Sequence, residues 1–339
     1  MRTLFPGRNI GIVMPIALLL VYGCTTNDLA PIKWTKKADL PLIIDARHHP
    51  VTFSIGGFGY YGLGSSYFAT CGSAGPNNSM ADFYRYDPAQ DSWKKLKNFP
   101  GGSRSFSYGV TYNGKAYLGF GQGGGFKNDL WEYDPTNDSW KELVPCPCAA
   151  REHPAMVQLN DKIYVGMGNE SLYTNLKDWW EYDITNNLWG KKDDLPGPAR
   201  HHPFYFSIGE YAYVGFGHGT LNVDGKYIYR DFYQYDPIQE SWTRLNNFPG
   251  MARVAGTQFT YKGKGYVLSG DNNTHNSFLT GEFWCYDPLT DSWKQLDSHP
   301  GTSRWAPGSF VIDDKLFFTS GTTRNKQAFM RDLFEFQLQ

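Results

Sequence analysis

Short runs of aromatic and aliphatic residues, separated by polar turns, recur along most of the chain. One phrase occurs five times: FYRYDPAQDSWKKL (83–96), LWEYDPTNDSWKEL (130–143), WWEYDITNNLWGKK (179–192), FYQYDPIQESWTRL (232–245) and FWCYDPLTDSWKQL (283–296). In every copy a tyrosine precedes a tryptophan by seven residues, and Asp-Pro follows the tyrosine in four of them. Proline fixes φ and lacks the N–H that would continue a strand ladder. The phrase therefore predicts a strand ending at the tyrosine, a turn, and an antiparallel strand carrying the tryptophan.

The segment between two copies of the phrase predicts two further strands. Each tryptophan is followed by a Pro/Gly corner and then by an arginine. The stretch YNGKAYLGFG (112–121) is typical of the segment after the arginine: Asn113-Gly114 is a strong two-residue hairpin signal, and the second strand ends in glycine. Four strands per unit and a period of about 50 residues are typical of a β-propeller blade.

The sixth unit is divided between the two ends of the chain. It begins at Arg304 and stops at LFEFQLQ, with no tryptophan phrase after it. The missing piece is IKWTKKADLP (32–41), which carries Trp34 and the corner and is followed by Arg47. We predict an all-β, six-bladed propeller over 32–339, with four antiparallel strands per blade. Its last blade is closed by the N-terminal strand, which leaves no free sheet edge.

These phrases resemble those of the kelch-repeat family over nearly all of 32–339. The Tyr-Asp-Pro, the tryptophan seven residues on and the strand-ending glycines all recur, although the kelch double glycine appears here mainly as Gly-x-Gly. The resemblance implies a kelch-type propeller. Exported bacterial proteins of this kind, often called galactose-oxidase-like, are similar to the sialic acid mutarotases. Kelch propellers also serve as binding platforms, so the fold does not decide the function.

Composition agrees with an all-β chain and argues against one class of partner, nucleic acid. The 339 residues include 17% aromatics, 37 Gly and 20 Pro, a mix that favours short strands and tight turns. The formal net charge is −1 and the basic residues are scattered. We therefore expect a monomer with no nucleic-acid partner.

The N-terminus reads as an export signal. Arg2 and Arg8 precede the apolar run IGIVMPIALLLVY (10–22), which is short for a membrane span. The run ends at Gly23-Cys24, which resembles a bacterial lipoprotein signal. We expect a signal peptide over 1–23, lipidation of Cys24 and a polar tether over 24–31. Thr25 then favours the outer membrane of a bacterial envelope, facing the periplasm or the surface. Ordinary cleavage beside a chance cysteine is the alternative.

Four further cysteines, Cys71, Cys146, Cys148 and Cys285, are expected to be structural or free. Cys146 and Cys148 are separated by one proline, which we take as too tight for a mutual disulfide. They also lack the second Cys or His pair that a zinc site would need.

Residues that repeat in every blade are expected to be structural. Each blade has one arginine (Arg47, Arg104, Arg151, Arg200, Arg253, Arg304) and one acid at the start of its third strand (Asp82, Asp129, Asp178, Asp231, Glu282, Asp332). We predict that each arginine crosses a glycine and pairs with the acid of its own blade, because an unpaired, half-buried charge is expensive. The alternative is a ring of unpaired arginines that binds an anionic ligand.

The two residues after each arginine differ between blades and are candidates for function. They are His48-His49, Ser105-Phe106, Glu152-His153, His201-His202, Val254-Ala255 and Trp305-Ala306. The two Arg-His-His-Pro copies, at 47–50 and 200–203, should face each other across the axis. The predicted ligand-binding residues at the pore mouth are His48, His49, Arg151, Glu152, His153, Arg200, His201, His202 and Trp305. Trp305 would offer a platform for a sugar ring.

A metal site is one interpretation of these histidines. However, side chains alternate along a strand, so His48 and His49 should point in opposite directions, and the gap across the channel should be too wide for a direct bridge. Glu152, His153, His201 and His202 form the better case, but histidines bonded to loop carbonyls are commoner. We expect no metal and no cofactor. Copper oxidase chemistry of the galactose oxidase type needs a Tyr-His dipeptide, and the sequence has none.

The leading hypothesis is a non-catalytic module that binds a glycan or protein ligand at the Arg/His-lined pore mouth. The long loops 65–80, 218–230 and 271–280 are rich in residues suited to polar recognition. The alternative is a carbohydrate mutarotase or epimerase of the N-acetylneuraminate epimerase type, with Glu152 and His153 or His201 as acid and base, and with Arg200 holding a carboxylate. A third hypothesis is an envelope scaffold that binds another protein through its loops. It would contact the membrane only through its lipid anchor.

Overall fold

The computed structural model describes residues 31–66, 78–171, 174–219, 228–272, 276–323 and 328–338. The chain divides into two compact units, and the one described here is Ile32–Leu338. The predicted signal peptide, Cys24 and most of the tether lie outside the described residues. Within the described part of the chain, no helix is both long and apolar enough to cross a membrane.

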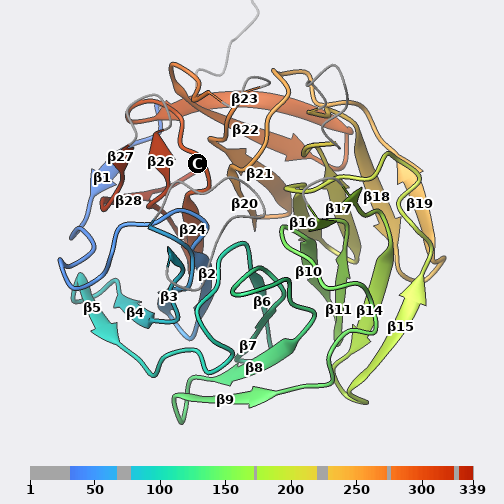
Figure 1. Ribbon diagram of the computed structural model, residues 1–339. Coiled ribbons are helices and arrows are strands. Elements are labelled where there is room, and N and C mark those ends of the chain that lie inside the picture. Colours follow the sequence, from blue (N-terminus) through green and yellow to red (C-terminus); the bar gives the residue numbers. More distant parts are fainter. Residues whose placement is uncertain are drawn as a thin grey trace, which may run out of the picture. The chain divides into compact units, whose positions relative to one another are not determined.

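Six four-stranded antiparallel sheets form the six predicted blades, counted here in chain order (Figure 1). Blade 1 is β2 (Val51–Ile55), β3 (Phe58–Gly62), β4 (Phe83–Asp87) and β5 (Ser92–Lys95). Blade 2 is β6 (Tyr108–Tyr112), β7 (Lys115–Gly119), β8 (Leu130–Asp134) and β9 (Ser139–Glu142). Blade 3 is β10 (Ala155–Leu159), β11 (Lys162–Gly166), β14 (Trp179–Asp183) and β15 (Leu188–Lys192).

Blade 4 is β16 (Phe204–Ile208), β17 (Tyr211–Gly215), β18 (Phe232–Asp236) and β19 (Ser241–Arg244). Blade 5 is β20 (Thr257–Tyr261), β21 (Lys264–Leu268), β22 (Gly281–Asp287) and β23 (Ser292–His299). Blade 6 is β24 (Gly308–Ile312), β25 (Lys315–Thr319), β28 (Leu333–Phe336) and β1 (Trp34–Lys36). The innermost strands β2, β6, β10, β16, β20 and β24 each contact the next one around the axis, and β24 contacts β2.

The repeated phrase folds as predicted because its tyrosine and tryptophan are cross-strand partners. The pairs are Tyr86–Trp93, Tyr133–Trp140, Tyr182–Trp189, Tyr235–Trp242 and Tyr286–Trp293, with ring centroids 4.6–5.0 Å apart. In blade 2 the Tyr133 hydroxyl donates to Asp138, which has a left-handed φ of 47°. Aspartate tolerates this conformation better than most residues. One side-chain bond thus fixes both the turn and the packing of the two outer strands.

The hydrophobic core lies between neighbouring blades. The first residue of the third strand packs against the Tyr/Trp pair of the next blade, as Phe232 does against Tyr286 and Trp293, at 4.9 and 5.2 Å. Phe283 of blade 5 packs in the same way against Phe336 and Trp34 of blade 6. Because these contacts repeat around the ring, each blade buries its aromatic face only when its neighbour is present.

Closure of the ring by the N-terminal strand is confirmed. Strand β1 pairs with β28 in the register Trp34 to Phe336 and Lys36 to Phe334, and blue β1 lies beside red β28 in Figure 1. The Trp34 ring stacks on Phe336 with centroids 4.0 Å apart. These two residues therefore replace the Tyr/Trp pair in blade 6.

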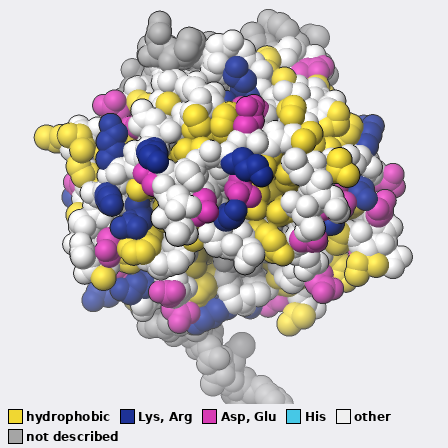
Figure 2. Space-filling view, turned by 90° about the horizontal axis from the view of Figure 1, so that it is seen from below, with side chains coloured by type: hydrophobic (Ala, Val, Ile, Leu, Met, Phe, Trp, Pro, Cys, Tyr) yellow, Lys and Arg dark blue, Asp and Glu magenta, His cyan; other side chains and the backbone are white. Residues whose placement is uncertain are grey.

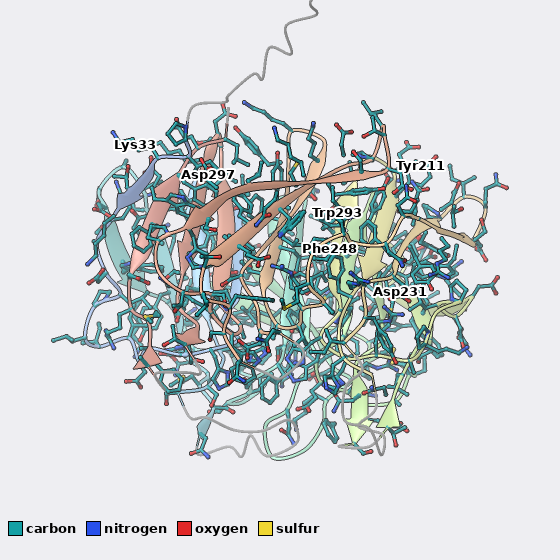
Figure 3. The ribbon with its side chains drawn as sticks, turned by 90° about the horizontal axis from the view of Figure 1, so that it is seen from above. Lys33, Tyr211, Asp231, Phe248, Trp293 and Asp297 are labelled. Carbon is teal, nitrogen blue, oxygen red and sulfur yellow. A yellow bond between two sulfur atoms is a disulfide. The ribbon has the colours of Figure 1, made fainter. Side chains whose placement is uncertain are left out.

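The two ends of the propeller axis differ. We call loop end the end that carries the connections from the second to the third strand of each blade, including the short pairs β12 (Asn169–Ser171) with β13 (Thr174–Asn175) and β26 (Thr322–Thr323) with β27 (Ala328–Phe329). The outer face seen in Figure 2 carries interspersed basic, acidic and hydrophobic side chains, and no described histidine is visible there. In the perpendicular view of Figure 3, Tyr211 lies toward the opposite end from the β12–β13 pair.

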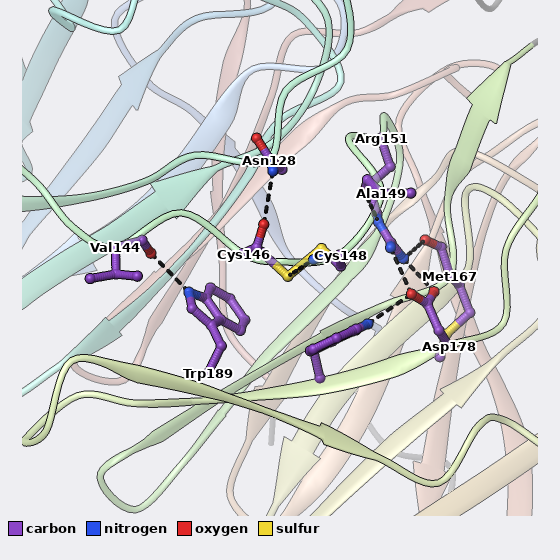
Figure 4. The surroundings of a disulfide bond; sticks show 10 residues. Asn128, Val144, Cys146, Cys148, Ala149, Arg151, Met167, Asp178 and Trp189 are labelled. Carbon is purple, nitrogen blue, oxygen red and sulfur yellow. Dashed lines mark hydrogen bonds and ion pairs between the residues drawn. A yellow bond between two sulfur atoms is a disulfide. The ribbon is translucent and has the colours of Figure 1, made fainter.

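Cys146 and Cys148 form a disulfide, so the expectation that they are too close is wrong (Figure 4). Their Cα atoms are 5.1 Å apart, within the range that a disulfide spans. The Asn128 side chain donates to the carbonyl of Cys146 and holds this corner against strand β8. Cys285 is free and buried, and Cys71 lies outside the described residues.

Candidate functional site

Six arginines, one per blade, form buried ion pairs near the loop end. Each pairs with the acid of its own blade: Arg47–Asp82, Arg104–Asp129, Arg151–Asp178, Arg200–Asp231, Arg253–Glu282 and Arg304–Asp332. The arginine side chains are at most 4% exposed. Own-blade pairing is confirmed, and a ring of unpaired arginines is wrong. Arg151 and Arg200, expected to meet a ligand, are both engaged in this scaffold.

In each blade a glycine lets the chain beyond the second strand approach the backbone of the residue after the arginine. Arg151 donates to the Met167 carbonyl at 3.0 Å as well as to Asp178 at 2.5 Å, as Figure 4 shows. The next residue, Gly168, has φ +85°, and a Cβ there would lie 2.5 Å from the Glu152 carbonyl oxygen. The other five arginines also donate to the carbonyl sixteen residues later, so one scaffold repeats around the axis.

The second residue after each arginine closes the axis. His49, Phe106, His153, His202, Ala255 and Ala306 all have a left-handed φ of 47–62° and are at most 6% exposed. Their backbones are linked between neighbouring blades, for example from the His49 N–H to the Ala306 carbonyl at 2.9 Å and from the His202 N–H to the His153 carbonyl at 3.3 Å. We call these six residues the axial ring.

Three histidines of the axial ring converge at its centre. His49 and His202, from opposite blades, approach Nε2 to Nε2 at 2.8 Å, with one nitrogen donating to the other. The His153 ring lies 3.3 Å from the His202 ring and 5.0 Å from the His49 ring, centroid to centroid. One ring nitrogen of each histidine lies within 4.8 Å of the other two.

Two of the sequence-based arguments about these histidines are therefore wrong. His48 and His49 do not point apart, since their Nδ1 atoms are 2.8 Å from each other. The channel is not too wide for a bridge, since His49 reaches His202 directly. The alternation rule assumes an extended strand, whereas the left-handed conformation at His49 turns its side chain toward the axis.

His153 and His202 are held in their neutral form. Burial lowers the pKa of His153 and of His202 well below the ordinary value, and the neighbouring histidines lower it further. A neutral imidazole carries one donor and one acceptor nitrogen. The cluster can therefore pass hydrogen bonds from one ring to the next and offer unprotonated nitrogens.

A second layer of residues, which we call the mouth layer, lies just outside the axial ring at the loop end. It consists of the first residue after each arginine and its bridge partner: His48–Ser65, Ser105–Gln122, Glu152–Asn169, His201–His218, Val254–Asp271 and Trp305–Thr322. Both members of the pair are polar in blades 1 to 4, and the titratable residues that follow the arginines lie in blades 1, 3 and 4. The tips of the long loops, 67–77, 220–227 and 273–275, lie outside the described residues.

Glu152 and His201 are the two mouth-layer residues that the sequence predicts as a possible acid or base. Glu152 is fully buried, accepts a hydrogen bond from Asn169 at 3.0 Å, and lies 4.0 Å from His153 Nε2. His201 is half-buried, and its Nδ1 is 2.8 Å from the Asn175 side-chain oxygen. The structure thus brings the predicted pair Glu152 and His153 together.

Trp305 lies at the wall of the histidine cluster. It is 2% exposed, and its ring centroid is 4.5 Å from that of His48 and 4.7 Å from that of His49. In this arrangement its faces contact the protein. All nine predicted ligand-binding residues thus lie near the loop end, seven in the two layers and two in the arginine scaffold.

Four residues of this site were missed by sequence reasoning: Asn169, Asn175, His218 and Asp271. Three of them directly follow the glycine that ends the second strand, in Gly168-Asn169, Gly217-His218 and Gly270-Asp271. That position pairs with the residue after the arginine, so comparing it between blades would have found them. Asn175 lies in β13, and among the described residues only blade 6 has a comparable short strand pair.

Beyond the axial ring, the inner strands enclose a channel of about 310 Å³. It starts at Pro50 and Pro307, which follow ring residues His49 and Ala306, and it is lined by side chains such as Thr52, Gln158 and Tyr205. Several of its hydroxyls are bonded within the wall, as Thr52 is to the Ser309 carbonyl. The channel is thus polar, and part of its polar surface is bonded within the wall.

Comparison with known proteins supports the fold. A model of the Attractin/LZTR1 beta-propeller family matches residues 67–325. No curated protein matches the sequence. The solved structure of YjhT is similar with a TM-score of 0.69 and 16% identity, over 89% of this chain and 99% of that chain. At this identity the similarity shows a common fold and carries no residue of the site across.

Proposed function

Since the chain belongs to the Attractin/LZTR1 beta-propeller family, which is kelch-type, we propose that it is an exported binding module that takes a glycan at the loop end of its axis. The main supporting observation is that the residues of the repeated scaffold and the residues particular to single blades are different sets. Arginines, acids and glycines repeat in all six blades, whereas the mouth layer places His48, Glu152 and His201 in three blades and Val254 and Trp305 in two others. Burying blade-specific polar groups costs stability, so selection for ligand contact explains them better than selection for folding.

The ligand test is a glycan array with the purified protein, followed by titration of each hit. His201→Ala should weaken binding by about tenfold or more. A tenfold loss of affinity is similar to the contribution of one hydrogen bond between uncharged groups. Thermal stability should change little, because His201 is half-buried. Tyr211→Ala, at the opposite end of the axis, is the matched control. An unchanged affinity in the His201 variant would contradict the proposed site. An array without hits would favour the third hypothesis, an envelope protein partner.

A mutarotase or epimerase is the second candidate, and the buried Glu152–His153 pair favours it. Ring opening of a sugar needs a general acid and a general base near the anomeric centre, and such groups contribute about 10²–10⁴-fold. NMR exchange between anomers would show acceleration by the wild-type protein and a loss of that order in Glu152→Gln. A binding module without catalysis would leave the exchange rate at its uncatalysed value.

Export and lipidation are part of the proposal and rest on the N-terminal sequence. The apolar run ends at Gly23-Cys24, and Thr25 follows. Metabolic labelling with a radioactive fatty acid should label the wild-type chain and leave Cys24→Ser unlabelled. Membrane fractionation should then find the wild type in the outer-membrane fraction. Labelling of both chains would overturn the assignment of Cys24. We propose that the protein acts there as a monomer, without nucleic acid.

A further inference from the structure

We propose that His49, His153 and His202 bind one divalent transition-metal ion of the zinc class at the centre of the axial ring. Each supplies one ring nitrogen, and these three nitrogens lie within 4.8 Å of one another. Imidazole is a preferred ligand of zinc and of its neighbours in the first transition row. The proposal concerns a site that the ligand-binding function does not require, so it stands or falls independently.

The distances fit a metal after the rings move: nitrogens that now lie up to 4.8 Å apart would close to the spacing of a metal site. In a tetrahedral zinc site with Zn–N of about 2.0–2.1 Å, two ligand nitrogens lie about 3.3 Å apart. The Nε2 atoms of His49 and His202 are 2.8 Å apart, so they would separate by about half an ångström. Three protein ligands leave a fourth position for water or a ligand atom, as in catalytic zinc sites.

The ligand side chains are already oriented by outer partners. Metal-binding histidines usually bond through their second nitrogen, which fixes the ring. His49 does this toward His48, Nδ1 to Nδ1 at 2.8 Å, which directs its Nε2 to the axis. Glu152, held by Asn169, lies 4.0 Å from the His153 ring and places a carboxylate close to the proposed cation. A buried charge is tolerated only near an opposite one.

The backbone conformation of the axial ring does not require histidine. The equivalent residues in the other three blades are Phe106, Ala255 and Ala306, and they adopt the same left-handed conformation. The left-handed backbone at this position is therefore compatible with alanine and with phenylalanine. The three histidines stand in blades 1, 3 and 4, where their rings meet, and this coincidence has a direct explanation if they share a metal.

The test is a calorimetric titration of the purified full-length protein with Zn²⁺ after removal of metals by chelator. We expect one equivalent to bind. His49→Ala, His153→Ala and His202→Ala should each weaken binding by more than the roughly 10–100-fold that loss of an outer partner costs, and His48→Ala should fall within that range. His299→Gln, which removes a buried histidine that contacts Phe318 and Ser269 in blades 5 and 6, should bind as the wild type does.

Substitution of Co²⁺ for Zn²⁺ keeps the proposal testable even if a variant fails to fold. The wild-type protein should give visible absorption bands of a tetrahedral cobalt site that saturate at one equivalent. Either of two results would overturn the proposal: a wild-type protein that binds no Zn²⁺ and gives no such bands, or a folded His49→Ala/His202→Ala protein that binds Zn²⁺ with wild-type affinity.

Discussion

His49 and His202 face each other across the propeller axis, Nε2 to Nε2 at 2.8 Å, although blades 1 and 4 share no sheet edge. In metal-free protein this contact should couple the two blades. A double-mutant cycle with His49→Ala and His202→Ala, measured by urea unfolding in chelator, should give an interaction energy of about 1 kcal/mol. Strict additivity of the two single variants would show that the contact contributes nothing to stability.

The Arg200–Asp231 pair tests the repeated scaffold. Arg200 is 0% exposed and Asp231 12%, so Arg200→Met leaves a mostly buried carboxylate without its partner. We expect a loss of about 3–5 kcal/mol in the free energy of unfolding, of which Arg200→Met/Asp231→Leu should regain a large part. The exposed pair Lys36–Asp39 is the control, because Lys36→Met should change stability little. Equal effects at the two sites would contradict the scaffold role.

Gly168 and Gly190 form a matched pair of glycine substitutions. At Gly168 a Cβ would lie 2.5 Å from a backbone oxygen and φ is +85°, whereas at Gly190 nothing lies within 4 Å. Gly168→Ala should lower the free energy of unfolding by more than about 1 kcal/mol, and Gly190→Ala should leave it unchanged or raise it. Chemical denaturation of both variants checks this, and a neutral Gly168→Ala would mean that the close approach to the Glu152 carbonyl does not need glycine.

His299 should make stability depend on pH between about 6.5 and 3. Burial, and then the charge of Arg304, lowers the pKa of His299 to about 3. Its Nδ1 donates to the Pro300 carbonyl, and its Nε2 bonds to the Ser269 hydroxyl. In this pH window the unfolded chain binds a proton that the folded protein excludes. The free energy of unfolding therefore decreases by about 1.4 kcal/mol for each unit by which the pH is lowered.

His299→Gln should remove this component, so its stability should decline less steeply than that of the wild type in urea unfolding at pH 7.5, 6.5, 5.5 and 4.5. Above pH 6.5 both the folded and the unfolded wild type carry a neutral His299, and the difference between the two proteins should be constant. Parallel curves across the whole range would show that His299 has the same pKa in the folded and in the unfolded protein.

Sequence reasoning finds the features that repeat. Trp34 and the six arginines are predicted correctly because five or six copies of one pattern constrain the geometry of each copy. The contact between His49 and His202 could not be predicted in this way, because it depends on a left-handed conformation at residues that are neither glycine nor asparagine. The rule that side chains alternate along an extended strand therefore predicts the wrong direction for the His49 side chain.

The residues particular to one blade are harder to predict. Asp271 and His218 occupy a repeated position, yet their chemistry varies between blades, and only the fold shows that they share a layer with His48 and Glu152. The Cys146–Cys148 bond is missed when spacing along the sequence is used as a measure of distance, because the local chain path sets the separation of the two Cα atoms.

The pairing of β1 with β28 sets the order in which this protein can mature. Blades 1 to 5 are each built from one continuous segment, so they can form as the chain is synthesised. Blade 6 has to wait until Phe336 is available to Trp34, and pairing across such a separation is intrinsically slow. Until then β1 and the incomplete sixth sheet present open edges, which invite proteolysis and aggregation. A chain that ends before β28 therefore leaves β1 without its partner strand and the ring open.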